Sequence, residues 1–196
     1  MNKKKYPIFI VGGILLIVVI FFIVSYNGLV KKEEKVKLQW NEMQNAYQRR
    51  LDLIPSLVST VKGAAEFEQS TLQKIVEARA KAASVTISGD GPAADQYQQQ
   101  QNAQNELAGA TNSLLLTVEK YPTLQGTAAF RGLQAQLEGT ERRIKFARKD
   151  FNAAIADYNS SVRGFPTKIV AGIFGFKARE GFTADEGSDT SKEIKF

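Results

Sequence analysis

The chain has 196 residues and contains neither cysteine nor histidine. It therefore has no disulfide bond, no thiol nucleophile and no imidazole, which excludes serine–histidine triads and histidine-ligated zinc or haem sites. The formal net charge is +6, and Lys3, Lys4 and Lys5 supply half of it. The remaining charges are mixed in sign and form no basic stripe with interleaved aromatics, so we expect no nucleic-acid binding.

Residues 8–24 form an uncharged apolar segment between Tyr6 and Tyr26. About 20 helical residues cross the hydrocarbon core of a bilayer, and tyrosine is typical of its two interfaces. A cleaved signal peptide is the alternative, but its apolar region is usually shorter and ends in a small-x-small site, which is missing after Val24. We therefore expect residues 1–26 to be a retained, single-pass anchor in the lipid bilayer of the cell (inner) membrane. Lysines on both sides of the segment leave the side of the soluble domain open.

Beyond the anchor, apolar residues recur every three or four positions, which is typical of one face of a long helix over residues 27–62. They are Val36, Trp40, Met43, Tyr47, Leu51, Ile54, Val58 and Val61. We expect Trp40 to pack in the core rather than to stack on a ligand. At Pro55 either the helix bends, or Asp52 caps a new helix that starts just before the proline. The apolar face keeps its phase through Pro55, which favours a bend.

Two further helices are expected over residues 66–84 and 93–120, separated by a turn around Ser88–Pro92. Their inward-facing residues are expected to be Phe67, Leu72, Ile75 and Val76 in the first, and Leu107, Leu114, Leu115 and Val118 in the second. The glutamines at 98–101 favour a solvated helix face over a disordered tract. Tyr121–Pro122 ends the second of these helices.

The fourth helix has the most regular pattern, with apolar residues three, four or seven positions apart from Phe130 to Val162. Such a stripe is typical of a bundle or coiled coil, and Phe165–Pro166 closes it. A short apolar segment follows, which either docks on the bundle or lies on a membrane or partner surface. Its apolar residues are Ile169, Val170, Ile173, Phe174 and Phe176. Residues 179–196 are rich in glycine, serine, threonine and acids, and we expect a mobile polar tail.

Several strings along the chain resemble the LemA family. The most specific is R-R-L-D-L-I-P-S-L-V at residues 49–58. The others are Tyr26–Val30, Val61–Gly63, Glu77–Ala80, Tyr121–Pro122, Glu141–Ile144, Tyr158–Asn159, Phe165–Pro166 and Phe174–Phe176. The resemblance covers nearly the whole chain, and it implies a single N-terminal anchor and an antiparallel four-helix bundle with long helices. We therefore expect an all-α protein with its bundle over residues 27–178. The resemblance supplies no catalytic residue and no cofactor.

Arg49, Arg50, Asp52 and Pro55 form the most distinctive cluster of the sequence. One interpretation is a patch that binds a partner beside the bend at the proline. The other is an ion-pair network that fixes the bend, with Arg49 or Arg50 bonding the carbonyl that the proline leaves free and Asp52 orienting the arginine. We favour the structural interpretation, because a proline inside a helix costs about 3 kcal/mol or more without such support.

Glu141, Arg142, Arg143 and Asp150 could face that cluster from the last long helix. Carboxylates on facing helices hold two metals in ferritin-like bundles, but those sites also use Glu-x-x-His, and this chain has no histidine. We therefore expect no metal site.

The sequence thus favours a non-catalytic, membrane-anchored scaffold or adaptor, with a protein partner or a second copy of itself as binding partner. The alternative is a carboxylate-based envelope hydrolase, or a subunit of a membrane enzyme complex. A glycosidase needs two carboxylates across a cleft, and no spacing in the sequence singles out such a pair. An acid-lined, substrate-sized pocket would favour the enzyme, and an apolar surface would favour the adaptor.

Overall fold

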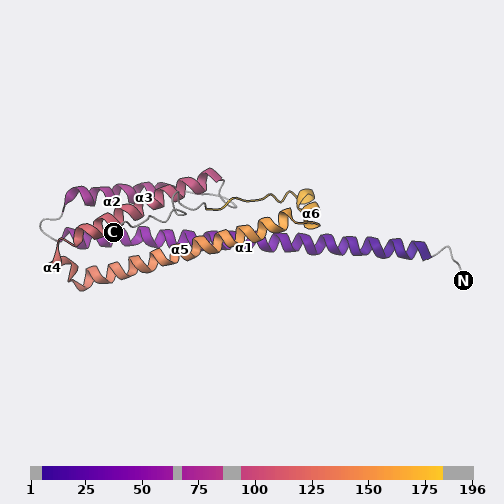
Figure 1. Ribbon diagram of the computed structural model, residues 1–196, viewed down its shortest axis with the longest axis horizontal. Coiled ribbons are helices and arrows are strands. Elements are labelled where there is room, and N and C mark those ends of the chain that lie inside the picture. The colour runs from indigo at the N-terminus through magenta and orange to yellow at the C-terminus, as the bar shows by residue number, and fades with distance from the viewer. Residues whose placement is uncertain (1–5, 64–67, 86–93, 183–196) are drawn as a thin grey trace, which may run out of the picture. The chain divides into compact units, whose positions relative to one another are not determined.

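The computed structural model describes residues 6–63, 68–85 and 94–182. Over these ranges it has six helices and no strand, so the expected all-α class is confirmed. The helices are α1 (Tyr6–Lys62), α2 (Gln69–Ser84), α3 (Ala94–Val118), α4 (Pro122–Gln125), α5 (Ala128–Arg163) and α6 (Thr167–Phe174) (Figure 1). The chain divides into two compact units. The first unit comprises residues 1–40 and 150–179, and the second comprises residues 41–149 and 180–196.

Helix α1 joins the apolar segment to the amphipathic helix without a break over 57 residues. Its N-terminal part is long and apolar enough to cross a membrane, judged by length and composition, and none of that stretch is buried within the protein. The helix continues through Pro55, so Asp52 does not cap a new helix, whereas the bend at the proline stays a prediction. The apolar residues expected on its inner face are buried, except Val58, which is partly buried.

In the second unit, side chains from α1 to α5 share one apolar core. It contains Leu51, Leu53, Ile54, Leu57, Val61, Leu72, Ile75, Ala78, Ala82, Ala103, Leu107, Leu114, Val118, Leu124, Phe130 and Leu137. Helices α2 and α3 are antiparallel, because Glu68 before α2 pairs with Lys120 after α3 at 3.7 Å, and Lys81 near the end of α2 pairs with Glu106 within α3. The core therefore requires contributions from elements far apart in the sequence.

Two expectations about which residues face the core and which face solvent are wrong. Val76 is half exposed, because α2 turns its smaller residues Ala78 and Ala82 inward together with Leu72 and Ile75. The glutamine run is not a solvated face, since residues 98 and 99 are exposed whereas residues 100 and 101 are buried. Successive helical residues are rotated by about 100°, so four in a row cannot share one face. Phe67, the turn around 88–92 and residues 183–196 of the expected tail lie outside the described residues.

The short helix α4 was not expected from the sequence. Pro122 opens it, a position at which proline is favoured because its missing N–H would have no partner within the helix. Leu124 of this single turn is buried in the core of the second unit. A one-turn helix shows no periodicity that a sequence pattern could reveal.

In the first unit, α1 and α5 run antiparallel. Lys32 Nζ lies 2.7 Å from Asp157 Oδ1, and the rings of Trp40 and Phe151 pack with their centroids 5.4 Å apart. Trp40 is buried, which confirms its expected place in the core. Helix α6 follows α5 after three residues and buries Val170 and Ala171.

Candidate functional site

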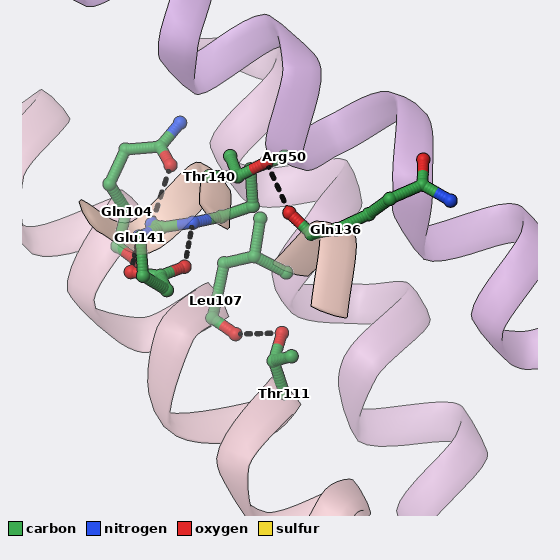
Figure 2. A network of polar contacts seen from close by, with 7 residues as sticks. All are labelled: Arg50, Gln104, Leu107, Thr111, Gln136, Thr140 and Glu141. Atoms are coloured by element: carbon green, nitrogen blue, oxygen red, sulfur yellow. Dashed lines mark hydrogen bonds and ion pairs between the residues drawn. The ribbon is translucent and has the colours of Figure 1, made fainter. Parts of the chain in front are cut away.

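The most unusual feature of the second unit is a buried charged residue on α1. Arg50 is only 4% exposed. Its Nε donates to Glu141 Oε1 at 2.8 Å and its Nη2 bonds the other oxygen of the same carboxylate, which makes a two-point ion pair with α5. Its Nη1 donates to both the backbone oxygen and the side-chain oxygen of Gln104 on α3, at 2.9 and 3.0 Å (Figure 2). All three nitrogens of the guanidinium are therefore used to hold α1, α3 and α5 together.

The environment of Arg50 explains why a charge is tolerated there. Burying an ionised group costs several kcal/mol unless paired charges and hydrogen bonds offset the lost hydration. Glu141 supplies the opposite charge, and its side chain stays 44% exposed to water. The buried Thr140 beside Glu141 donates its hydroxyl to the Gln136 backbone oxygen, 2.8 Å away, so its polar group is also bonded within α5. Within the described residues, no buried side-chain nitrogen or oxygen lacks a partner.

A second polar contact joins the same helices six residues before Arg50. The amides of Gln44 on α1 and Gln100 on α3 bond each other reciprocally, at 2.9 and 2.8 Å. This pairing bonds the amide of Gln100 in its buried position. Burial also raises the pKa of Tyr47 above its ordinary value of 10.0, although Arg148 and Arg50 act in the opposite direction.

The four residues singled out by the sequence do not act as one cluster. Arg49 is exposed and donates to Gln136 on α5 at 2.9 Å, and Asp52 is exposed and accepts from Gln48 one turn earlier at 2.8 Å. Arg50 points to α3 and α5 instead. Whether the group around Pro55 has a binding or a structural role stays a prediction.

The carbonyl freed by Pro55 is bonded by a residue that the sequence argument missed. Proline lacks the N–H that would reach the backbone oxygen of Leu51, four residues earlier. Arg79 of α2 donates its Nε to that oxygen at 3.0 Å. Arg49 or Arg50 was expected to make this contact. Arg79 lies in one of the strings that resemble the LemA family, but nothing in its local sequence reveals a contact with a carbonyl 28 residues away.

Glu141 meets Arg50 as the sequence argument allowed, whereas Arg142 and Arg143 are exposed on α5. Asp150 belongs to the first unit and is also exposed. Among the described residues, no group of three or more acidic side chains gathers in a way that could hold a metal ion.

Two concave surfaces of the second unit bear on its chemistry, one beside the polar contacts of α1 and one lined by carboxylates. A pocket of about 140 Å³ adjoins Gln44, Tyr47 and Arg79, and it is smaller than the roughly 300–1,000 Å³ of usual ligand sites. An open groove of about 340 Å³ lies between α2 and α3 and is lined by Glu77, Glu106 and Lys74 among small residues. Glu106 pairs with Lys81 on α2, and Glu77 accepts a hydrogen bond from its neighbour one turn earlier.

The fold and the buried polar contacts define a helical protein whose first helix carries an exposed apolar segment. The model of the LemA family matches residues 39–196, and the chain belongs to this family.

Its relatives include two magnetosome proteins, MamQ 1 and MamQ 2 of Paramagnetospirillum magneticum. Each is 26% identical over 185 residues, which cover 86% of this chain and 68% of the relative. Protein LemA of Metamycoplasma hominis is 23% identical over 180 residues, which cover 87% of this chain and 78% of the relative.

Proposed function

We propose that the chain is a membrane-anchored, non-catalytic scaffold of the LemA family. Residues 1–26 anchor it by a single pass in the cell membrane, and the soluble domain assembles with a protein partner or with a second copy. The observation that carries the proposal is the continuity of α1, which takes one helix from an exposed apolar segment into a packed core. Exposing such a segment to water is unfavourable, so a bilayer is its natural surrounding.

We further propose that the soluble domain is an antiparallel four-helix bundle of α1, α2, α3 and α5. Its support comes from contacts within each unit. Ion pairs make α2 antiparallel to α3, and the contacts of Lys32 and Trp40 make α1 antiparallel to α5. A bundle with its polar groups bonded internally offers rigid outer helix faces, which suits assembly.

The contacts of Arg50 with Glu141 and Gln104, here called the polar layer, support a structural role over a catalytic one. A catalytic arginine keeps donors free for a substrate, whereas every nitrogen of Arg50 already bonds Glu141 or Gln104. The magnetosome proteins among the relatives are compatible with a role at a membrane.

The α2–α3 groove keeps the alternative of a carboxylate-based hydrolase open to test. It is the place where two carboxylates, Glu77 and Glu106, share a concave surface. If the protein degrades envelope polymers there, Glu77→Gln and Glu106→Gln should each abolish the activity of the purified full chain. If the chain is a scaffold, the wild-type protein releases no more product than the variant that carries both Glu77→Gln and Glu106→Gln.

Extraction with alkaline carbonate tests the anchor. We expect the full chain to stay in the membrane pellet, and the double variant Leu16→Lys/Ile20→Lys to move to the supernatant, because lysine at the centre of a span costs about 2.5–3.5 kcal/mol. Leu116→Lys/Phe146→Lys is the matched control, since both residues are exposed apolar positions in the second unit. Release of the wild-type chain, or equal retention of all three, would contradict the proposal.

A further inference from the structure

The segment after α6 is fastened to the first unit by specific polar contacts. The side-chain amide of Asn159 on α5 donates to the backbone oxygen of Arg179 at 2.7 Å and accepts from its backbone N–H at 2.8 Å. The guanidinium of Arg179 reaches Glu33 on α1 at 2.6 Å and lies over the ring of Tyr158. Arg179 was expected to begin a mobile tail, and here it bonds both helices. These contacts hold the segment that follows α6 against α1 and α5.

Helix α6 presents a mixed surface. Val170 and Ala171 face inward and are buried. Ile169 and Ile173, one turn apart, are 50% and 63% exposed, and Phe174 is 52% exposed. Phe165, just before the helix, is 86% exposed. Four large apolar side chains within ten residues are an unusual amount of exposed apolar surface for a segment that is otherwise docked.

The C-terminal end of α6 and the residues after it contact α1 just beyond its apolar segment. The ring of Tyr26 lies 4.8 Å from that of Phe174 and 5.7 Å from that of Phe176, between centroids. Gly175 makes this possible, because its φ of 78° ends the helix in a left-handed turn that few other residues adopt. In Figure 1, α6 lies beside α1.

Tyr26 also fixes the depth of α6 if α1 crosses a bilayer. It is two residues beyond Val24, so it lies about 3 Å past the end of the apolar segment along the helix axis. That is the level of the headgroups, where tyrosine is enriched. Phe174 and Phe176, in contact with the Tyr26 ring, lie at the same level.

We propose that the outer face of α6, formed by Ile169, Ile173 and Phe174 and extended by Phe165 just before the helix, lies in the lipid interface as a second membrane contact. This rests on the proposed insertion of α1. The exposed Lys168 and Lys177 lie within three residues of the apolar face and suit anionic headgroups, and α6 itself carries no acidic residue. A bilayer is favoured over a protein partner because the apolar face continues directly, through Tyr26, into the apolar segment of α1.

A depth measurement on the full chain tests the proposal. The chain has no cysteine, so a single introduced cysteine can carry an environment-sensitive fluorophore without competing sites. The three labelled variants are Ile173→Cys on α6, Leu16→Cys in the anchor and Leu116→Cys, an exposed apolar position of the second unit. Each is placed, one chain per disc, in phosphatidylcholine–phosphatidylglycerol nanodiscs that carry nitroxide on either the headgroup or the deep acyl chain.

We expect the probe at 173 to emit at shorter wavelength than the probe at 116, with quenching strongest from headgroup nitroxide. The probe at 16 should be quenched most by the deep nitroxide. Emission at 173 as in water, with the probe at 16 still embedded, would overturn this inference and leave the anchor intact. Water-like emission at both positions would instead contradict the proposed anchor. A shift at 173 that needs two chains per disc would show that a second copy covers α6, which also overturns the inference.

Discussion

The backbone oxygen of Leu51 gives a direct test of how a long helix tolerates Pro55. In the structure this oxygen is bonded by Arg79 from α2, because the proline has no N–H to offer. We expect Arg79→Met, which keeps the aliphatic stem but removes the donor, to leave the oxygen unpaired in a partly buried place. In the background of Pro55→Ala, the restored N–H of residue 55 reaches the same oxygen, so the loss of Arg79 should matter less.

The magnitude follows from the nature of the bond. A hydrogen bond from a charged group contributes about 1.5–3 kcal/mol net and a neutral one about 0.5–1.5. Because Arg79 is only partly buried, we expect a value where the two ranges meet, about 1–2 kcal/mol, for Arg79→Met. With alanine at 55 the same change should cost below about 0.5 kcal/mol, an ordinary value for a surface substitution. The two changes should therefore be coupled by about 1 kcal/mol.

Urea unfolding of the full chain in detergent micelles, followed by circular dichroism, measures the four free energies of the cycle. Arg142→Met is the matched control, because it removes the same charge from an exposed position, and we expect it to be close to neutral. Additivity of Pro55→Ala and Arg79→Met within about 0.3 kcal/mol would refute the claim that Arg79 compensates for the proline.

Three further changes probe the packing and the polar layer in the same unfolding assay. Arg50→Met should destabilise the fold by about 2–4 kcal/mol, because it breaks an ion pair with one buried partner. Arg49→Met, at an exposed position, should cost under about 0.5 kcal/mol. Similar values for the two variants would contradict the account. Burial holds the pKa of Tyr47 above that of the same group in the unfolded chain, so the free energy of unfolding should fall as the pH rises above about 10. Tyr47→Phe should reduce this fall. An unchanged dependence of stability on pH would contradict this prediction. Phe151→Ala removes a fully buried ring against Trp40 and should cost about 3–5 kcal/mol; a loss below about 1 would mean that the ring is not in the core.

The helices were predictable because their signals are local. The apolar seam from Val36 to Val61 and the stripe from Phe130 to Val162 each repeat at helical spacing, and the structure buries nearly all of their residues. The apolar segment at residues 8–24 was equally easy to recognise, since its composition alone identifies it. These patterns fix which face of a helix turns inward, but not which helix it meets.

The polar layer could not be predicted, because local patterns do not say which helices meet. Arg50 and Arg49 are adjacent and identical in type, yet one is buried against Gln104 and Glu141 and the other is exposed. Helical phase places Arg50, three residues after Tyr47 and four before Ile54, on the inward face of α1. Only the placement of α3 and α5 shows which groups it bonds there. The contact of Arg79 with the carbonyl freed by Pro55 likewise depends on how α2 packs, which no local spacing encodes.

The most direct test of a membrane-anchored scaffold is site-specific photo-cross-linking in native membranes. A photoreactive residue placed at the exposed Leu116 of the full chain should give one discrete adduct, with a protein partner or with a second copy. The account predicts that the adduct disappears in Leu16→Lys/Ile20→Lys, although the variant stays folded by circular dichroism. An adduct of equal yield from the chain that cannot insert, or no adduct at Leu116 or at a second exposed position such as Phe146, would contradict it.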